Sequence, residues 1–234
     1  MNHSRQGVDS AESERQAALL QSLSQGMHDI AQPLAIMQGK LELCVMKGDA
    51  ANCLAAIEES LHALSRVVEL FSYLRELVRI AKDDEPQSAV QIIPLVLSVA
   101  EDLGCIIRAS GVQFQLECPE RLPLIHVCET RVRQALFYAL QAVQSVSRAP
   151  DTVLLAVVHK AATIEVCVAN HSQSTHIKPE GCEFKRAITL TKAIVEAQQG
   201  SFCYHQAPLA VTICFPLVGY HETAPGKARY QRNE

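Results

Sequence analysis

The segment with the clearest chemical capacity in this 234-residue chain is Gly26-Met-His-Asp-Ile-Ala-Gln-Pro-Leu-Ala-Ile-Met-Gln-Gly39. An imidazole is partly neutral near pH 7, so one ring nitrogen of His28 can attack phosphorus, while Asp29 can accept the other N–H and fix the tautomer. Gln32 follows His28 by four positions, which places both side chains on one helix face, and Pro33 perturbs the helix at the next position. Taken alone, the motif favours an ordinary surface histidine beside an aspartate.

Two apolar patterns indicate the helices that must carry this segment. Residues three and four positions apart form a coiled-coil-like seam at Leu20, Leu23, Met27, Ile30, Leu34, Met37, Leu41 and Cys44. After a turn at 47–50, the pattern resumes at Leu54, Ile57, Leu61, Leu64, Val68, Phe71 and Val78. We expect a flexible tail at 1–11 and an antiparallel helical hairpin at 12–83, which ends at the helix-breaking sequence Asp83-Asp-Glu-Pro86.

The length of the two seams has a consequence for assembly. One hairpin cannot bury both apolar stripes, and pairing two hairpins into a four-helix bundle is the usual solution. We therefore expect a homodimer, with His28 and Gln32 on the outer face of the first helix, off the seam.

The hydrophobic period changes after Pro86. The pattern predicts helices at 88–109, 130–147 and 185–199, and strands at 112–116, 124–127, 152–159, 163–169, 201–205 and 210–215. A polar, turn-rich loop is expected at 171–181, and Gly200 suits a helix C-terminal cap. This order predicts an α/β sandwich over 87–219 with helices on one face of the sheet, a flexible tail at 220–234, and an α+β chain as a whole.

Composition excludes several classes of protein. The formal net charge is −4 with 20% charged residues, so no basic field is available to bind nucleic acid. No apolar window reaches the roughly 18 residues needed to cross a bilayer, and the N-terminus lacks a signal peptide. The nine cysteines form no Cys-x-x-Cys pair. We therefore expect reduced, mostly buried thiols in a cytoplasmic protein without membrane or nucleic-acid partners.

The histidine segment and its context resemble the catalytic core of bacterial sensor histidine kinases. His-Asp-x-x-Gln-Pro-Leu at 28–34 resembles the H-box, whose histidine is phosphorylated on a dimeric four-helix bundle. Residues 126–140 resemble the strand and helix that carry the N-box, and residues 190–200 resemble the helix after the second glycine-rich box. The resemblance spans residues 20–217 and implies that the sandwich is of the histidine kinase ATPase-like type.

The nucleotide-binding motifs of that family are altered here. The N-box asparagines would fall at Tyr138 and Ala142, which offer magnesium no carboxamide oxygen. The Asp-x-Gly-x-Gly box aligns with Asn170-His-Ser-Gln-Ser174, so an amide replaces the adenine-reading acid and serines replace glycines. The second glycine-rich box aligns with Lys185-Arg-Ala-Ile188, whose side chains obstruct close approach of backbone N–H groups to phosphates. We therefore expect a degenerate ATP site, with no cofactor and no metal on this chain.

The remaining intact feature is a phosphorylatable histidine on a dimeric bundle, as in the kinase-derived histidine phosphotransferases of phosphorelays. By that resemblance, a receiver-domain aspartate passes a phosphoryl group to His28, which passes it to a second receiver, and the receivers bring the magnesium. Response-regulator receivers, and a hybrid histidine kinase, are the expected partners in this two-component signalling. They would dock on the exposed helix flank at Ala35, Ile36 and Gly39, and Gln32, where the family commonly carries Asn or Thr, would orient the attacking group or a hydrolytic water.

Two other functions stay open at this point: a residual histidine kinase that uses ATP, and a noncatalytic dimeric scaffold that binds receivers. His62 is an alternative phosphoacceptor, but it lacks a neighbouring acid and proline. His171 and His176, with Cys167 and Cys182 nearby, suggest zinc, but their spacing matches no standard tetrahedral pattern.

Overall fold

The computed structural model describes residues 3–47, 50–82, 85–172 and 181–218. The chain divides into two compact units, Met1–Asp84 and Glu85–Glu234. The expected C-terminal tail at 220–234 and most of the loop expected at 171–181 lie outside the described residues.

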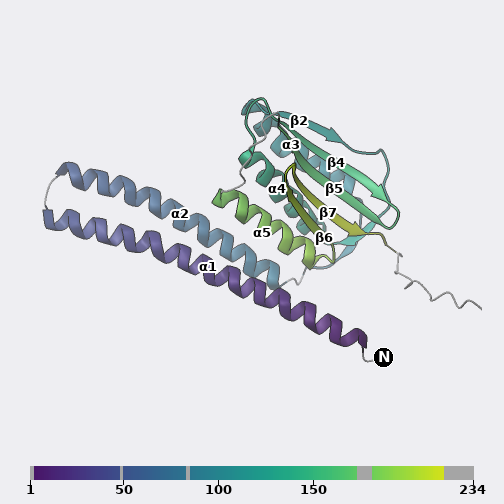
Figure 1. Cartoon of the computed structure of the whole chain (residues 1–234), viewed down its shortest axis with the longest axis horizontal. Helices are drawn as coiled ribbons and strands as arrows, with labels where there is room; N and C mark the ends of the chain where they lie inside the picture. The colour runs from purple at the N-terminus through teal and green to yellow at the C-terminus, as the bar shows by residue number, and fades with distance from the viewer. Residues whose placement is uncertain (1–2, 48–49, 83–84, 173–180, 219–234) are drawn as a thin grey trace, which may run out of the picture. The chain divides into compact units, whose positions relative to one another are not determined.

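The first unit is an antiparallel hairpin of two long helices, α1 (His3–Lys47) and α2 (Ala50–Lys82) (Figure 1). Helix α1 begins at His3, so residues 3–11, where we expected a flexible tail, are helical. These residues contain no proline and are followed by helix-forming Glu, Gln and Ala, but they lack an apolar stripe, which is why periodicity gave no sign of them. Pro33 lies inside α1 and does not end it.

The seam predicted along α1 divides into two lines in the structure. Leu23, Ile30, Met37 and Cys44 are buried or half-buried, whereas the alternate positions Leu20, Met27, Leu34 and Leu41 are between 38% and 67% exposed. The whole predicted stripe of α2, from Leu54 to Val78, is exposed as well. The hairpin therefore buries part of its apolar surface between the two helices and leaves one apolar line of each helix in solvent.

The cysteines differ from the expectation of reduced, mostly buried thiols. Cys44 and Cys53 form a disulfide between α1 and α2, with their Cα atoms 5.1 Å apart. An antiparallel hairpin places residues at equal distances from its turn opposite one another, which a search for Cys-x-x-Cys pairs does not detect. Among the seven free cysteines, only Cys128 is buried.

The second unit is the expected sandwich. Its helices are α3 (Ile92–Ala109), α4 (Glu129–Val146) and α5 (Cys182–Ala197). Its strands are β1 (Ser88–Val90), β2 (Gln113–Glu117), β3 (Ile125–Val127), β4 (Thr152–Lys160), β5 (Thr163–His171), β6 (Ser201–Gln206) and β7 (Leu209–Pro216). The five-stranded sheet has the order β2-β4-β5-β7-β6, with β2 parallel to β4 and the other neighbours antiparallel.

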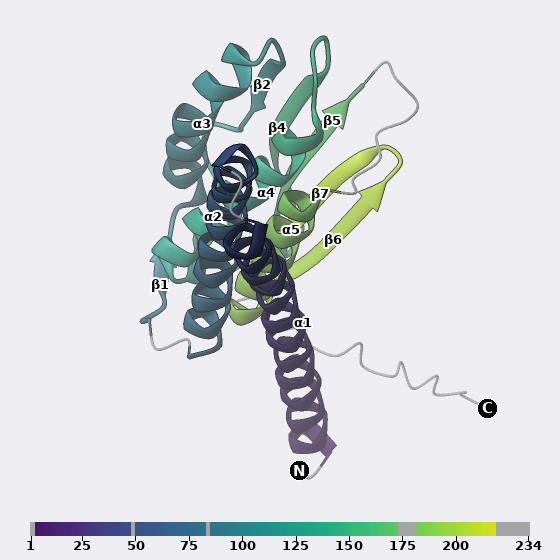
Figure 2. The ribbon, with the colours of Figure 1, turned by 90° about the vertical axis from the view of Figure 1, so that its left-hand side faces the viewer.

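The core of the sandwich lies between this sheet and the helices. Figures 1 and 2 show α3, α4 and α5 together on one face of the sheet. Alternate strand residues point to that face and are buried, among them Val153 and Leu155 of β4, Val166 of β5, and Ile213 and Phe215 of β7. The β-branched pattern in the sequence therefore identified strands β4 and β5, and the alternation of buried residues in the structure shows which side of the sheet carries the core.

Two helix ends differ from the expectation. The helix expected from residue 88 begins at Ile92, because Ser88–Val90 instead pairs with β3 as a short two-stranded sheet. After α5, Gln199 and not Gly200 adopts the left-handed conformation, with φ of 58°. Gly200 is needed for a different reason: a Cβ there would lie 2.8 Å from the carbonyl oxygen of Cys214 on β7.

Candidate functional site

The candidate nucleophile His28 is an exposed side chain on α1, and Gln32 is exposed one helical turn later. Asp29 is half-buried, and its Oδ1 accepts a hydrogen bond of 2.9 Å from Nε2 of Gln25. Its second carboxylate oxygen carries no such bond in the described part of the chain. The role of Asp29 as the acceptor for the imidazole N–H therefore stays a prediction.

Pro33 changes the backbone immediately after His28. Because proline has no N–H, the carbonyl of Asp29, four residues earlier, lacks its usual intrahelical donor. That carbonyl belongs to the residue that follows the histidine. The helix consequently has one main-chain carbonyl without its i+4 donor at the residue after the histidine.

Gly26 brings α2 close to α1 at the level of His28. A Cβ at this position would lie 2.4 Å from Cδ2 of Leu74, which is buried. A side chain at position 26 would therefore require the Leu74 side chain to move. The sequence motif contained Gly26, but its close contact with α2 could not be read without the partner helix.

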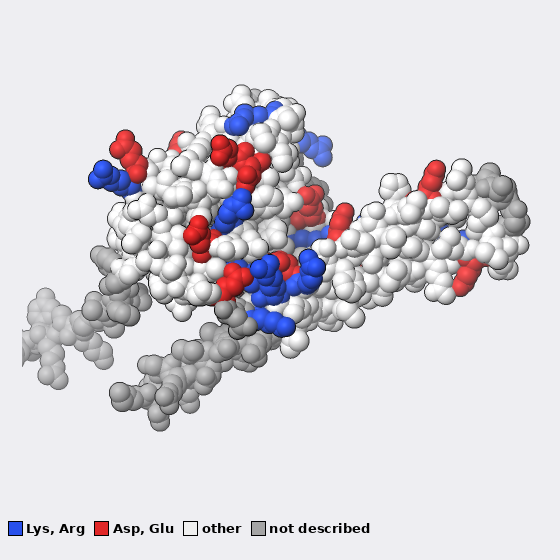
Figure 3. Space-filling model, turned by 180° about the vertical axis from the view of Figure 1, so that it is seen from behind, with Lys and Arg blue, Asp and Glu red and all other residues white. Residues whose placement is uncertain are grey.

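The proposed docking flank lies along α1 beyond His28. Ala35 and Ile36 are exposed, and a Cβ added to Gly39 would meet no atom within 4 Å. None of the three residues carries a charge. In Figure 3 the hairpin arm shows few charged side chains on the face in view. Steric openness and low charge leave this part of α1 accessible to another helix.

The alternative phosphoacceptor His62 is also exposed, on α2. Its chain neighbours are Leu61 and Ala63, so no carboxylate adjoins it in the sequence, and α2 has no proline that opens its backbone. Exposure therefore does not separate His62 from His28, whereas the immediate chemical surroundings do.

In the sandwich, the positions of the N-box asparagines lie on α4. Tyr138 is half-buried and Ala142 is fully buried in the core. Between them, Nε2 of Gln141 lies 3.4 Å from Oε1 of Glu183 in the first turn of α5. The hydrogen bond links α4 directly to the start of α5 and places a carboxylate at the helix N-terminus, where a phosphate would otherwise be attracted.

The position of the adenine-reading acid is occupied by a buried polar cluster. Nδ2 of Asn170 donates to Oγ of Ser147 at 2.6 Å and to Oδ2 of Asp151 at 3.1 Å. Burial raises the pKa of Asp151, but hydrogen bonds from the Arg148 N–H, Ser172 and Asn170 oppose it and bring the pKa below its ordinary value. The Asn170 amide therefore donates a hydrogen bond to the ionised Asp151 carboxylate. An acid at position 170 would instead place a second negative charge beside it.

The segment that we aligned with the second glycine-rich box is helical. Residues Lys185 to Ile188 lie inside α5, which begins at Cys182, earlier than the expected start at 185. The N–H of Lys185 donates to the carbonyl of Gly181 at 3.1 Å. Helical hydrogen bonding occupies the backbone N–H groups that a glycine-rich loop would offer to phosphates. Ser172 of the first glycine-rich box is described, while Ser174 lies outside the described residues.

Three of the four residues considered for zinc, Cys167, His171 and Cys182, lie in the described part of the chain. Cys167 lies on β5 and Cys182 begins α5, while His176 lies outside the described residues. Within the described ranges, no group of three or more His, Cys, Asp or Glu side chains has a geometry that could hold a metal ion. No described helix is both long and apolar enough to pass through a bilayer.

Two solved histidine kinases share this architecture. Histidine kinase ThkA, in a crystal structure of its complex with the response regulator protein TrrA, aligns with a TM-score of 0.65 and 15% identity over 93% of this chain and 67% of its own. The Acinetobacter baumannii histidine kinase AdeS aligns with a TM-score of 0.57 and 15% identity over 81% of this chain and 96% of its own. The hairpin and the sandwich thus have the fold of a histidine kinase core.

Sequence comparison points to the same class of protein. The adaptive-response sensory kinase SasA of Synechococcus sp. strain JA-3-3Ab is 24% identical over 203 residues, which are 83% of this chain and 52% of that protein. SasA of strain JA-2-3B'a(2-13) is 25% identical over 141 residues. No protein-family model matches the chain. The chain therefore resembles histidine kinase catalytic cores. It spans about half the length of SasA from strain JA-3-3Ab.

Proposed function

We propose that the protein is a histidine phosphotransferase of a two-component phosphorelay. His28 accepts a phosphoryl group from a receiver aspartate and donates it to an aspartate of another receiver. One observation carries the proposal: an exposed histidine is retained on a kinase-type hairpin, while the segment that should bind ATP phosphates is folded into α5. Such a chain has a phosphoryl acceptor, and we infer that another protein supplies the phosphoryl group in place of ATP bound to the sandwich.

The transfer step requires little covalent assistance from the protein. The lone pair of a neutral imidazole nitrogen attacks phosphorus in line, the P–N bond forms, and the P–O bond to the receiver aspartate breaks to release its carboxylate. The second oxygen of the Asp29 carboxylate accepts the other ring N–H and stabilises the positive charge that develops on the imidazole. Passing the group to a second receiver is the reverse reaction. The protein contributes alignment, and the receivers contribute magnesium.

A residual histidine kinase is the second candidate, because the likeness to SasA and to the solved kinases fits it equally well. The structure favours phosphotransfer over ATP use at the three altered motifs. Ala142 is buried and offers no metal ligand, Asn170 is engaged by Ser147 and Asp151, and Glu183 brings negative charge to the start of α5. A triphosphate would have to displace each of these arrangements.

The proposed active form is a homodimer. The exposed line on α1 and the exposed stripe on α2 together leave two rows of large apolar side chains in solvent. Contiguous apolar surface of this extent is typical of an interface, and two copies of an antiparallel hairpin can bury it as a four-helix bundle. Because His28 lies off these lines, it stays accessible in that assembly.

Receiver domains are the proposed partners, and the ThkA structure contains a response regulator as its partner. On this chain the receiver would contact α1 just beyond His28, at Ala35, Ile36 and Gly39, so that its aspartate reaches the imidazole. A hybrid histidine kinase would supply the first receiver. Gln32, on the same face as His28, would orient the attacking group or a water.

The source of the phosphoryl group that labels the chain distinguishes the candidate functions. The purified 234-residue chain is incubated in parallel with a panel of receiver domains loaded from labelled acetyl phosphate and with γ-labelled ATP and magnesium. We expect label on the chain from at least one receiver and none from ATP. Label from ATP alone would support the residual kinase, and receiver binding without label in either arm would support the scaffold.

A further inference from the structure

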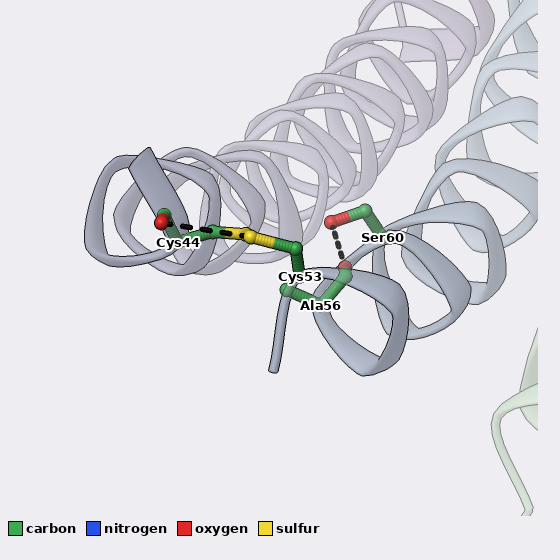
Figure 4. Close-up of a disulfide and its surroundings, with 4 residues drawn as sticks. All are labelled: Cys44, Cys53, Ala56 and Ser60. Carbon is green, nitrogen blue, oxygen red and sulfur yellow. Dashed lines mark hydrogen bonds between the residues drawn. A yellow bond between two sulfur atoms is a disulfide. The ribbon is translucent and has the colours of Figure 1, made fainter. Parts of the chain in front are cut away.

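The tip of the hairpin contains two cysteines that face each other across the turn. Cys44 near the end of α1 and Cys53 near the start of α2 are joined by a disulfide (Figure 4). Their Cα atoms are 5.1 Å apart, well within the range that a disulfide spans without backbone movement. The backbone of the hairpin therefore places the two cysteines within disulfide-bonding distance.

The described side chains around the disulfide are largely open to solvent. Among the described residues, no side chain of 38–46 or 52–59 is buried. Lys40 and Glu59 form an ion pair between the helices, but both are about half exposed, so this pair contributes little. The apolar side chains of the tip instead line an open groove on α1 at Leu34, Met37, Leu41, Val45 and Met46. The Cys44–Cys53 link thus connects the helix ends covalently, and a second molecule that covers this apolar surface would stabilise their pairing further.

We propose that Cys44 and Cys53 are a redox modification site that controls self-association of the hairpin. This inference rests on the homodimer of the proposed function. With the disulfide formed, the two helix ends are held in the arrangement that a second hairpin must meet, so less conformational entropy is lost on dimerisation. With both thiols reduced, the helix ends fray, and the dimer is weaker. By linkage, dimerisation in turn favours the disulfide by the same factor.

The modification is a thiol–disulfide exchange with a low-molecular-weight disulfide. One cysteine thiolate attacks a sulfur of that disulfide, and a mixed disulfide forms as one small thiol leaves. The other cysteine thiolate then attacks the protein sulfur of the mixed disulfide and releases the second small thiol. Two protein thiols are oxidised, one small disulfide is reduced to two thiols, and the two protons end on those thiols.

The test uses the full-length chain equilibrated in glutathione buffers of increasing oxidised fraction. Maleimide mass labelling and peptide mapping report which thiols have reacted, and sedimentation equilibrium reports the dimer dissociation constant in the fully reduced and oxidised states. We expect the Cys44–Cys53 disulfide to form and the dissociation constant to fall by about threefold or more. In a fixed glutathione buffer, the disulfide fraction should rise with protein concentration.

Matched variants separate this site from other thiols. The double variant Cys44→Ser/Cys53→Ser should show the same dissociation constant in both buffers. In contrast, Cys105→Ser/Cys182→Ser, which removes two exposed free cysteines, should retain the response. A dimer whose affinity does not depend on the Cys44–Cys53 disulfide, or thiols that stay reduced throughout, would contradict this inference and leave the dimer intact. A monomer in both redox states would contradict the dimer as well, and the inference with it.

Discussion

At the scale of single residues, the cluster around Asn170 explains why the sandwich tolerates an amide where the kinase family has an acid. The Asn170 amide donates to Asp151, whose pKa is low despite burial because three donors stabilise its carboxylate. The substitution therefore belongs to a network that includes Ser147, at the end of α4. A change at position 170 would therefore act on its buried neighbours as well.

This network makes the variant Asn170→Asp informative. A second carboxylate would lie about 3 Å from that of Asp151, and we expect a loss of about 2–4 kcal/mol in the free energy of unfolding at pH 7. Like charges raise the pKa of such a pair, so one group takes up a proton as the pH falls, and the loss should shrink toward pH 4. Urea unfolding across this pH range provides the measurement. Asn170→Ala is the control, and an Asp variant no less stable than the Ala variant at pH 7 would argue against the network.

Ile36 tests the docking flank. Its side chain is 51% exposed, so Ile36→Glu should leave stability within about 0.5 kcal/mol while placing a charge in the receiver contact. We expect the rate of phosphoryl transfer from a loaded receiver to fall about tenfold or more. Leu43→Glu is a matched control, since Leu43 is 52% exposed on the same helix but two turns farther from His28. Equal rates in the two variants would move the docking surface elsewhere.

At the scale of elements, the spacing between α1 and α2 is set near His28 by Gly26. Gly39, in the same helix, has open space around its Cα, which makes the two glycines a matched pair. Replacing a glycine in a helix with alanine normally stabilises by about 0.5–1 kcal/mol. The change in the free energy of unfolding on replacing each glycine with alanine therefore reports on how closely the other helix packs at that position.

We expect Gly39→Ala to raise the free energy of unfolding by about that amount. Gly26→Ala should gain nothing or lose about 1–2 kcal/mol, because the new methyl group overlaps the side chain of Leu74. Thermal unfolding followed by circular dichroism at 222 nm compares the two. If Gly26→Ala were stabilised as much as Gly39→Ala, the close approach of the helices at His28 would be refuted.

The elements also show what the sequence could and could not predict. Apolar periodicity predicted the hairpin, and alternation predicted the strands of the sandwich, because both patterns follow from burying one face. Periodicity did not detect the helical residues 3–11, which have no apolar face, or the pairing of Ser88–Val90, which depends on a strand distant in the sequence. The Cys44–Cys53 link and the cluster around Asp151 likewise depend on contacts between segments. The chemistry predicted for His28, Asp29 and Gln32 stays a prediction, since exposure alone does not establish a reaction.

At the scale of the whole molecule, the exposed apolar rows of the hairpin predict self-association. Phe71 is a large exposed side chain in the α2 row, so Phe71→Asp should weaken the dimer about tenfold or more while leaving the protomer folded. Val158→Asp, at an exposed position of β4 in the sandwich, is the control and should not change association. Sedimentation velocity over a range of concentrations is the measurement. A wild-type chain that is monomeric at 100 μM, or equal association of both variants, would contradict the proposed bundle.

The identity of the phosphoryl carrier is the central claim, and one measurement tests it most directly. A receiver loaded with labelled phosphate is mixed with wild type, His28→Gln and His62→Gln, and circular dichroism confirms that each protein is folded. Because His28 is exposed and outside the buried lines of the hairpin, its replacement should cost little stability while removing the attacking nitrogen. We predict acid-labile, base-stable label on wild type and His62→Gln, and none on His28→Gln. Label on folded His28→Gln at the wild-type level would contradict the account.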